Sequence, residues 1–359
     1  MNKQKGCIMK YAYFAVTSEG KALAVRMQEK FKGELQPISE VKSAYGKKDV
    51  LVFIMAAGIV TRLLAPLVES KTTDPAVLII DQKGKFIIPL LSGHLGGANE
   101  HAVEIAEYLG AQEVITTATD LCQVLSFEGV ARSNNLSIEN PAALKQVNAL
   151  LLQGASVELH TDHQIEWENP ELDRDCLHIL RYDPEDERAI LRGFQMCAKE
   201  ETAAVFLTSR ALPAREDGTY PPNILILRPK DVIIGIGCRS LVNEEYVYQA
   251  LKTALERQNL PEGAICRFAT TSLKGREPAV LMLSERLGVP VELIDTEDIR
   301  KVEYLFIQSP FVQQVTNVGN ISAPCAYISS GKGRMLMVRT TFPGGVTLAI
   351  AQERRSITL

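Results

Sequence analysis

Glycines, a serine, a histidine and an asparagine crowd one stretch of the sequence, SGHLGGAN, over residues 92–99. His94 could act as a general base or acid near neutral pH. The glycines let the backbone approach a ligand, and a helix start after Asn99 would offer free N–H groups to an anion. A tight turn with Asn99 as helix N-cap explains the pattern equally well. The candidate binding residues here are Ser92, Gly93, Gly96, Gly97 and Asn99.

Other polar side chains lie near the ends of neighbouring predicted strands. Arg62 could hold a carboxylate through two parallel hydrogen bonds, although an exposed helix face is the more common place for such an arginine. Asp74 lies in the loop before the next strand, and VITTATD ends another strand with Thr117 and Asp120. Thr117 could donate to a ligand, and the two carboxylates are candidate bases. Capping of the next helix is the alternative role for this threonine-rich end.

The last third of the chain carries a second set of candidates. IGIGCRS, at residues 234–240, places Gly237 and Arg239 after an apolar strand. ATTSLKGREP, at residues 269–278, adds Thr271, Lys274 and Glu277. A lysine with hydroxyl groups suits recognition of carboxylates or a polarised carbonyl, and Glu277 is a further candidate base. A helix cap with a surface ion pair is the competing interpretation.

Metal binding and thiol catalysis are not expected. His160 and His163 fall on opposite faces of a predicted strand, and with His178 and Cys176 they match no zinc spacing. Cys238 lacks a following histidine to activate it. We therefore predict no metal site and no cofactor held by the protein.

Composition excludes several classes of protein. A net charge of −4 over 359 residues argues against nucleic-acid binding through bulk charge. Seven cysteines without a C-x-x-C pair indicate reduced thiols, as in the cytoplasm. The longest apolar run, residues 50–60, is too short to cross a bilayer. Neither G-x-G-x-x-G nor G-x-S-x-G occurs, which disfavours a nucleotide enzyme or an ordinary α/β hydrolase.

The candidate residues require a scaffold of alternating strands and helices. Apolar runs predict strands over 11–17, 49–57, 76–81, 85–91 and 113–120, and helices over 19–31, 58–68 and 99–110. Continuous apolar strands alternating with helices indicate a parallel or mixed sheet covered on both faces. Ligands of such sheets bind outside the carboxyl ends of the strands, where we place the glycine-rich turn.

The rest of the chain predicts two more α/β regions. The last third yields strands over 231–240, 264–272 and 289–295, helices over 243–260, 277–288 and 296–306, and a hairpin over 333–353. The fold class is therefore multi-domain α/β, with N- and C-terminal three-layer units on mostly parallel or mixed sheets and a smaller middle α/β domain. The expected domains are residues 1–120, 121–229 and 230–359.

Taken together, SGHLGGANE, VITTATD, IGIGCR and TTSLKGREP resemble the motifs of the CbiG family, the cobalt-precorrin-5A hydrolases of anaerobic cobalamin (vitamin B12) biosynthesis. The resemblance covers nearly the whole chain in the family's three-part order. The N-terminal motif is long and specific, whereas the C-terminal one is shared more widely, including with a protein of the aerobic route.

This resemblance implies a reaction. The family opens the δ-lactone that links the ring A acetate to the former meso carbon of cobalt-precorrin-5A, and releases acetaldehyde to give cobalt-precorrin-5B. Cobalt arrives inside the macrocycle, so no cofactor is implied. The expected partner is this tetrapyrrole, in the cytoplasm, with neither nucleic acid nor membrane. A homodimer and transient contact with neighbouring corrin-pathway methyltransferases are compatible with the resemblance.

Roles follow from the chemistry that lactone opening demands. We assign His94 as general base or acid, with Asp74, Asp120 and Glu277 as alternative bases. Gly96, Gly97 and Asn99 would contact a carboxylate or the developing oxyanion, and Arg62, Arg239 and Lys274 would hold peripheral carboxylates. A non-catalytic tetrapyrrole chaperone, which shields an intermediate and hands it to the next enzyme, is the competing function.

Overall fold

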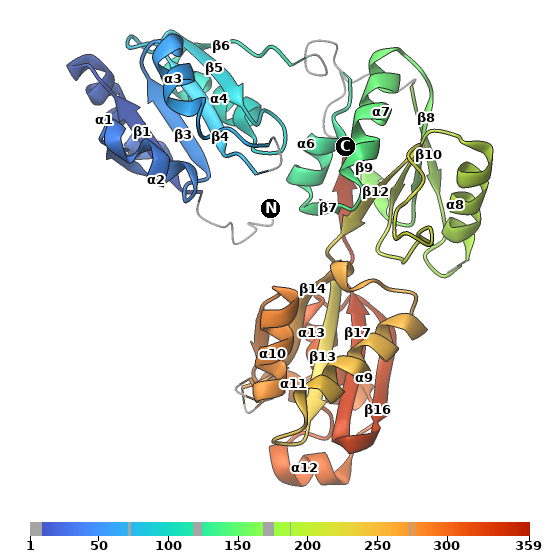
Figure 1. Cartoon of the computed structure of the whole chain (residues 1–359). Coiled ribbons are helices and arrows are strands. Elements are labelled where there is room, and N and C mark those ends of the chain that lie inside the picture. Colours follow the sequence, from blue (N-terminus) through green and yellow to red (C-terminus); the bar gives the residue numbers. More distant parts are fainter. Residues whose placement is uncertain are drawn as a thin grey trace. The chain divides into compact units, whose positions relative to one another are not determined.

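The computed structural model describes residues 9–70, 73–117, 124–167, 176–186, 188–272, 274–275 and 277–359. The chain divides into two compact units (Figure 1). The first holds Met1–Ser133 with two short later segments, and the second holds the remainder. Asp120 lies outside the described residues.

The first unit is a six-stranded sheet in the order β2-β1-β3-β4-β5-β6. Helices α1 and α4 pack on one face through a core that includes Met27 and Ile105. Helices α2 and α3 pack on the other face through Val41 and Leu64. The bounds are β1 Tyr11–Ala15, α1 Ser18–Phe31, β2 Glu34–Gln36, α2 Val41–Tyr45, β3 Val50–Ile54, α3 Ala57–Leu64, β4 Ala76–Ile80, β5 Phe86–Leu91, α4 Ala98–Leu109, β6 Gln112–Glu113 and α6 Phe127–Ser133. The predicted three-layer arrangement is confirmed for this unit.

The direction of β5 corrects the predicted position of the glycine-rich turn. Strands β1 to β4 are parallel, but β5 runs antiparallel to β4, with Leu91 opposite Val77. The carboxyl end of β5 therefore lies at the amino edge of β4. The turn that follows β5 is at the opposite edge of the sheet from the start of α3, where we had expected both.

The middle sheet has the order β10-β8-β11-β12-β7, parallel except for β7. Its elements are β7 Leu136–Ile138, α7 Pro141–Leu152, β8 Val157–Thr161, β10 Leu177–Arg181, α8 Ala189–Glu200, β11 Ala204–Leu207 and β12 Ile224–Pro229. A separate strand pair joins β9 (Gln164–Glu166) in parallel to β18 (Ser356–Thr358). Residues far apart in the chain thus meet beside this sheet.

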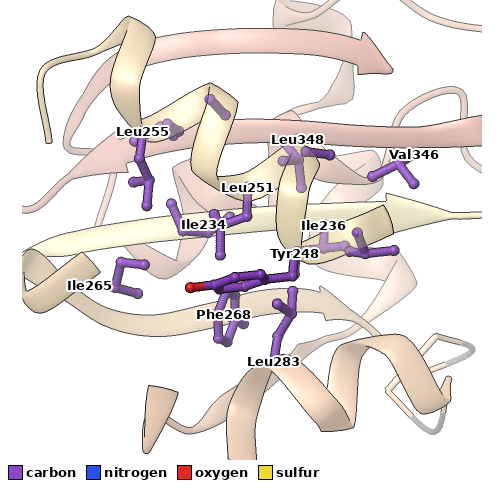
Figure 2. Close-up of a cluster of buried hydrophobic side chains, with 14 of the residues drawn as sticks. Ile234, Ile236, Tyr248, Leu251, Leu255, Ile265, Phe268, Leu283, Val346 and Leu348 are labelled. Atoms are coloured by element: carbon purple, nitrogen blue, oxygen red, sulfur yellow. The ribbon is translucent and has the colours of Figure 1, made fainter. Parts of the chain in front are cut away.

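The last sheet has the order β15-β14-β13-β17-β16, with β13, β14 and β15 parallel and β17 and β16 antiparallel. Helices α9 and α10 cover one face through Leu251, Leu283 and the other side chains of Figure 2. Helix α13 covers the other face and lies so close that a side chain on Gly235 would overlap the Ser322 carbonyl. The bounds are β13 Val232–Cys238, α9 Glu244–Arg257, β14 Ile265–Thr271, α10 Pro278–Leu287, β15 Val291–Ile294, α11 Thr296–Arg300, α12 Pro310–Thr316, α13 Ser322–Ser329, β16 Arg334–Phe342 and β17 Val346–Gln352.

Two of the predicted elements differ from the structure. The strand expected over 113–120 is reduced to β6, and residues 114–117 have no regular structure. The helix expected over 296–306 breaks into α11 and a 3-10 turn at Glu303–Leu305. Helices α12 and α13 were not predicted. Among the described residues, no helix combines the length and apolarity needed to cross a membrane.

Candidate functional site

The glycine-rich turn connects β5 to α4 with unusual backbone angles. Ser92 has a φ of 56° and Gly97 a φ of 76°, both in the left-handed region. Helix α4 begins at Ala98, so Gly97 is its N-cap. Asn99 is therefore not the N-cap, and its side chain contacts Thr117 instead.

The turn uses its own N–H groups internally. Gly97 N donates to the His94 carbonyl at 3.0 Å, Ala98 N to Ser92 at 3.1 Å, and Asn99 N to Gly93 at 3.1 Å. The backbone N–H groups of Gly97, Ala98 and Asn99 are therefore engaged within the turn in this conformation. Binding by these residues would depend on side chains or on movement of the turn.

Several predicted residues do gather at this edge of the sheet. The Ser92 hydroxyl donates to the Asp74 carbonyl at 2.8 Å. Asn99 Nδ2 donates to Thr117 Oγ1 at 3.1 Å. Strand β6 is parallel to the first residues of β5, so the chain after β6 runs in the same direction as β5 towards the turn. His94 stands between Ser92 and Asn99 in the sequence, and it is half-buried. The shared edge predicted for the SGHLGGAN and VITTATD motifs is therefore present.

The Asp74 carboxylate is buried and already engaged. It is 8% exposed and accepts from Glu69 N at 3.2 and 3.3 Å. Burial, followed by the neighbouring Asp74 carboxylate, raises the pKa of the Tyr45 phenol. These contacts suit a carboxylate that shapes the loop better than one that takes a proton from water.

Arg62 is placed away from this group. It lies on the exposed face of α3, and Nη1 donates to the Gly58 carbonyl of its own helix at 3.0 Å. Since α3 starts at the carboxyl edge of β3, Arg62 belongs to the other side of the sheet from the turn. Arg62 therefore occupies an exposed helix face, which was the alternative interpretation of this residue.

Two residues at the turn were missed by the sequence analysis. Arg132 of α6 forms an ion pair with Glu100, and its guanidinium fills the space that a side chain on Gly97 would need. His101 faces inward from α4, with Nδ1 3.0 Å from the Tyr11 hydroxyl. Burial first, and then Arg132, lowers the pKa of His101, so its imidazole is neutral at pH 7.

Only one of these two carried a sequence signal. His101 shares the apolar face of the predicted helix with Ala102 and Ile105, which indicates burial. Arg132 is 32 positions after Glu100 in the numbering, and no periodicity connects them. The Arg132 guanidinium places a positive charge beside the turn.

The second group of candidates meets in the last sheet. Lys274 Nζ lies 2.9 Å from Glu277 Oε1 and 3.1 Å from Ser240 Oγ, and Ser240 Oγ donates to the same carboxylate oxygen at 2.9 Å. The hydrogen bond from Lys274 holds the pKa of Glu277 below its usual value. Glu277 is therefore a poor general base. Its contact with Lys274 is the ion pair that the competing interpretation of this motif expected.

Thr271 and Cys238 have supporting positions in this group. Thr271 is 1% exposed, and its carbonyl accepts from Lys274 N at 2.9 Å, so it shapes the loop. Burial raises the pKa of the Cys238 thiol, which keeps it protonated at neutral pH. Its lack of nucleophilic character agrees with the prediction.

A pocket of about 400 Å³ opens beside the carboxyl end of β13. Gly237, Arg239 and Lys274 line it from the loops that the sequence singled out. Helix α12 contributes an apolar wall, and Phe311 and Val315 are 62% and 63% exposed. Arg339 of β16 adds a third cation to the lining. The pocket combines apolar surface with three cations, which suits a flat apolar ligand that carries carboxylates.

The histidines set aside as metal ligands have separate surroundings. His160 contacts Cys197 of α8, whereas His163 lies between Asp162 and Asp231, with N···O distances of 2.9 and 2.8 Å. His178 is exposed. Because β8 ends at Thr161, His163 lies outside the strand, and the two histidines have different partners.

Family models match three successive parts of the chain. They describe the N-terminal part of cobalamin synthesis protein G at residues 39–120, the cobalamin biosynthesis central region at 125–229, and the C-terminus of protein G at 232–351. A protein of Salmonella typhimurium named cobalt-precorrin-5A hydrolase is 33% identical over 310 residues, which is 86% of this chain and 83% of the relative. The chain belongs to the CbiG family.

Further members of the CbiG family are more distant. A cobalt-precorrin-5A hydrolase of Priestia megaterium is 26% identical over 84% of this chain and 78% of its own length. A solved structure of a cobalamin biosynthesis protein G homologue from Sulfolobus solfataricus is 21% identical, covers 96% of this chain and 97% of that one, and has a TM-score of 0.39.

Proposed function

We propose that this CbiG protein hydrolyses the ring A δ-lactone of cobalt-precorrin-5A and releases acetaldehyde, giving cobalt-precorrin-5B. The observation that carries the proposal is the 33% identity to the Salmonella typhimurium cobalt-precorrin-5A hydrolase over most of both chains. The matches to the N-terminal, central and C-terminal family regions support it, because all three regions are represented in the chain.

The pocket beside β13 supports the substrate class. A precorrin presents an apolar macrocycle rimmed by acetate and propionate arms. Phe311 and Val315 offer apolar surface to the ring, while Arg239, Lys274 and Arg339 offer cations to the arms. Lys274 is already paired with Glu277, so Arg239 and Arg339 are the stronger candidates for carboxylate binding.

Lactone opening needs a base that takes a proton from water as the water oxygen attacks the carbonyl carbon. The bond between that carbon and the ring oxygen then breaks and leaves an alkoxide on the former meso carbon. As this oxygen forms the aldehyde carbonyl, the carbon–carbon bond to the macrocycle breaks, its electron pair stays on the macrocycle, and the two-carbon fragment leaves as acetaldehyde. We assign the base to His94, because an imidazole can take up a proton near neutral pH and His94 lies in the same turn as Ser92 and Asn99. Arg132 supplies positive charge at the same turn, where an oxyanion could be stabilised.

The decisive experiment supplies cobalt-precorrin-5A to the purified chain and follows substrate mass and acetaldehyde. Hydrolysis gives both a mass change and free acetaldehyde, whereas a chaperone binds the substrate and leaves it intact. His94→Ala should slow turnover by about 10²–10⁴-fold, the usual contribution of a general base. The matched control is His178→Ala, which removes an exposed histidine of the middle region. Unchanged turnover by a folded His94→Ala variant would remove His94 from the mechanism.

A further inference from the structure

Three potential metal ligands that have no assigned role in hydrolysis converge in the middle sheet. They are the Glu158 carboxylate and the His160 imidazole, both of β8, and the Cys197 thiol of α8. Glu158 Oε2 lies 2.8 Å from His160 Nε2, Cys197 Sγ lies 3.4 Å from the same nitrogen, and the sulfur is 3.7 Å from Glu158 Oε2. One atom of each side chain therefore points at a common centre.

These separations are close to those of a zinc coordination shell. With usual zinc bond lengths and tetrahedral angles, a sulfur and an imidazole nitrogen lie about 3.6 Å apart, a nitrogen and a carboxylate oxygen about 3.4 Å, and a sulfur and an oxygen about 3.6 Å. Two of the three distances already agree within about 0.2 Å. Only the distance between Glu158 and His160 must open, and the Glu158 side chain, 35% exposed, has room to rotate.

The arrangement differs from a Cys-His-Glu catalytic triad. In a triad the nucleophile and the acid bind opposite nitrogens of the imidazole. Here both Cys197 and Glu158 approach Nε2, while Nδ1 lies 2.7 Å from the Tyr182 hydroxyl. A metal-bound histidine has this pattern, because its second nitrogen is engaged by a polar partner that fixes the ring.

The surroundings hold the imidazole in this orientation. The Phe206 ring stacks on His160 with centroids 4.4 Å apart and an interplanar angle of 15°. Gly193 of α8 makes room for the Tyr182 hydroxyl, because a side chain at that position would overlap it. His160 and Cys197 are 3% and 4% exposed. Two ligands are thus fixed by packing, and the partly exposed Glu158 leaves an entry path.

We propose that Glu158, His160 and Cys197 bind one zinc ion per chain in the middle region. The Cys197 thiol gives its proton to solvent as the sulfur–zinc bond forms, and neither the protein nor the metal changes oxidation state. Thiolate, imidazole and carboxylate together favour zinc over calcium or magnesium, which take oxygen ligands. The fourth position is left to water. This site departs from the sequence expectation of no protein metal site and lies outside the proposed hydrolytic machinery.

The test uses Co²⁺ as a spectroscopic substitute for zinc, added to chelator-treated full-length protein without any corrinoid. We expect one Co²⁺ per chain, a thiolate-to-cobalt charge-transfer band, and loss of that band when Zn²⁺ is added. Cys197→Ser should abolish the band. Cys266→Ser, which alters a half-buried cysteine of the last sheet, should keep it.

A second variant protects the test against misfolding, because Cys197 packs in the core of the middle region. Glu158→Gln changes a partly exposed side chain and should lower the affinity for Co²⁺ at least tenfold while the circular dichroism spectrum stays that of the wild type. Absence of the band in the wild type, its persistence in folded Cys197→Ser, or unchanged affinity in Glu158→Gln would overturn the proposal. None of these readouts depends on lactone hydrolysis, so the two proposals fail separately.

Discussion

Replacing His163 by glutamine tests a buried cluster of charged side chains in the second unit. His163 is 6% exposed and lies between the carboxylates of Asp162 and Asp231. Burial alone would lower the pKa of this imidazole, but the hydrogen bonds and charges of the two carboxylates raise it to about 10. Asp231 also accepts from Ser209 Oγ at 2.6 Å and Gln352 Nε2 at 3.0 Å. Glutamine removes the cation and leaves two buried carboxylates facing each other.

The size of the effect follows from the pKa. A rise from 6.5 to about 10 corresponds to roughly 5 kcal/mol as an upper limit. Loss of one partner from a buried ion pair costs about 3–5 kcal/mol, which gives the same range. Because the folded-state pKa is the higher one, the stabilisation is complete below pH 6.5 and is lost as the pH rises towards 10. Between pH 6 and pH 9 the advantage of the wild type should shrink by about two-thirds.

Urea denaturation at pH 6 and pH 9 measures this change. The chain has one tryptophan, Trp167, which lies in the second unit, so its fluorescence reports on the relevant region. His178→Gln serves as the matched control, since it replaces an exposed histidine. A difference in unfolding free energy between the wild type and His163→Gln that is equal at the two pH values would refute the assignment of a buried, protonated His163.

Two further substitutions test the candidate sites. Gly97→Ala should lower the free energy of unfolding of the first unit by about 1–3 kcal/mol, because it combines a left-handed backbone with overlap on Arg132. Gly110→Ala, which has the left-handed backbone without any neighbour, should cost less in the same thermal melt, and equal losses would argue against the Arg132 contact. Arg239→Met should raise the KM for cobalt-precorrin-5A about tenfold with kcat nearly unchanged, as expected for lost binding that is equal in ground and transition states. Steady-state kinetics decide this, and a fall in kcat alone would instead give Arg239 a role in the chemical step.

The central strands of the first sheet were predictable because they are continuous apolar runs, such as Val50–Ile54 and Ala76–Ile80. The direction of β5 was also within reach. Only Asp81–Lys85 separates β4 from β5, and a parallel crossover needs a dozen residues or more. Attention to that length would have placed the glycine-rich turn at the correct edge.

Other features had no local signal. Arg132 meets Gly97, and Cys197 meets His160, only through tertiary packing, and no spacing within the sequence joins them. The separation of Arg62 from the turn likewise depends on how the sheet is threaded. The chemistry that each side chain can perform was predictable from the sequence. Which side chains lie close together was not, because this depends on the order and direction of the strands in the sheets.

The pairing of β18 with β9 has a consequence for the order of folding. Asn134 donates to the Thr358 carbonyl at 2.8 Å and accepts from Thr358 N at 2.9 Å, and Leu359 N donates to Glu166 at 2.8 Å. During synthesis Thr358 and Leu359 leave the ribosome only after every strand of the last sheet has done so. The middle region must therefore wait, with this edge unpaired, until β18 returns to it, and its maturation is bound in time to that of its neighbour.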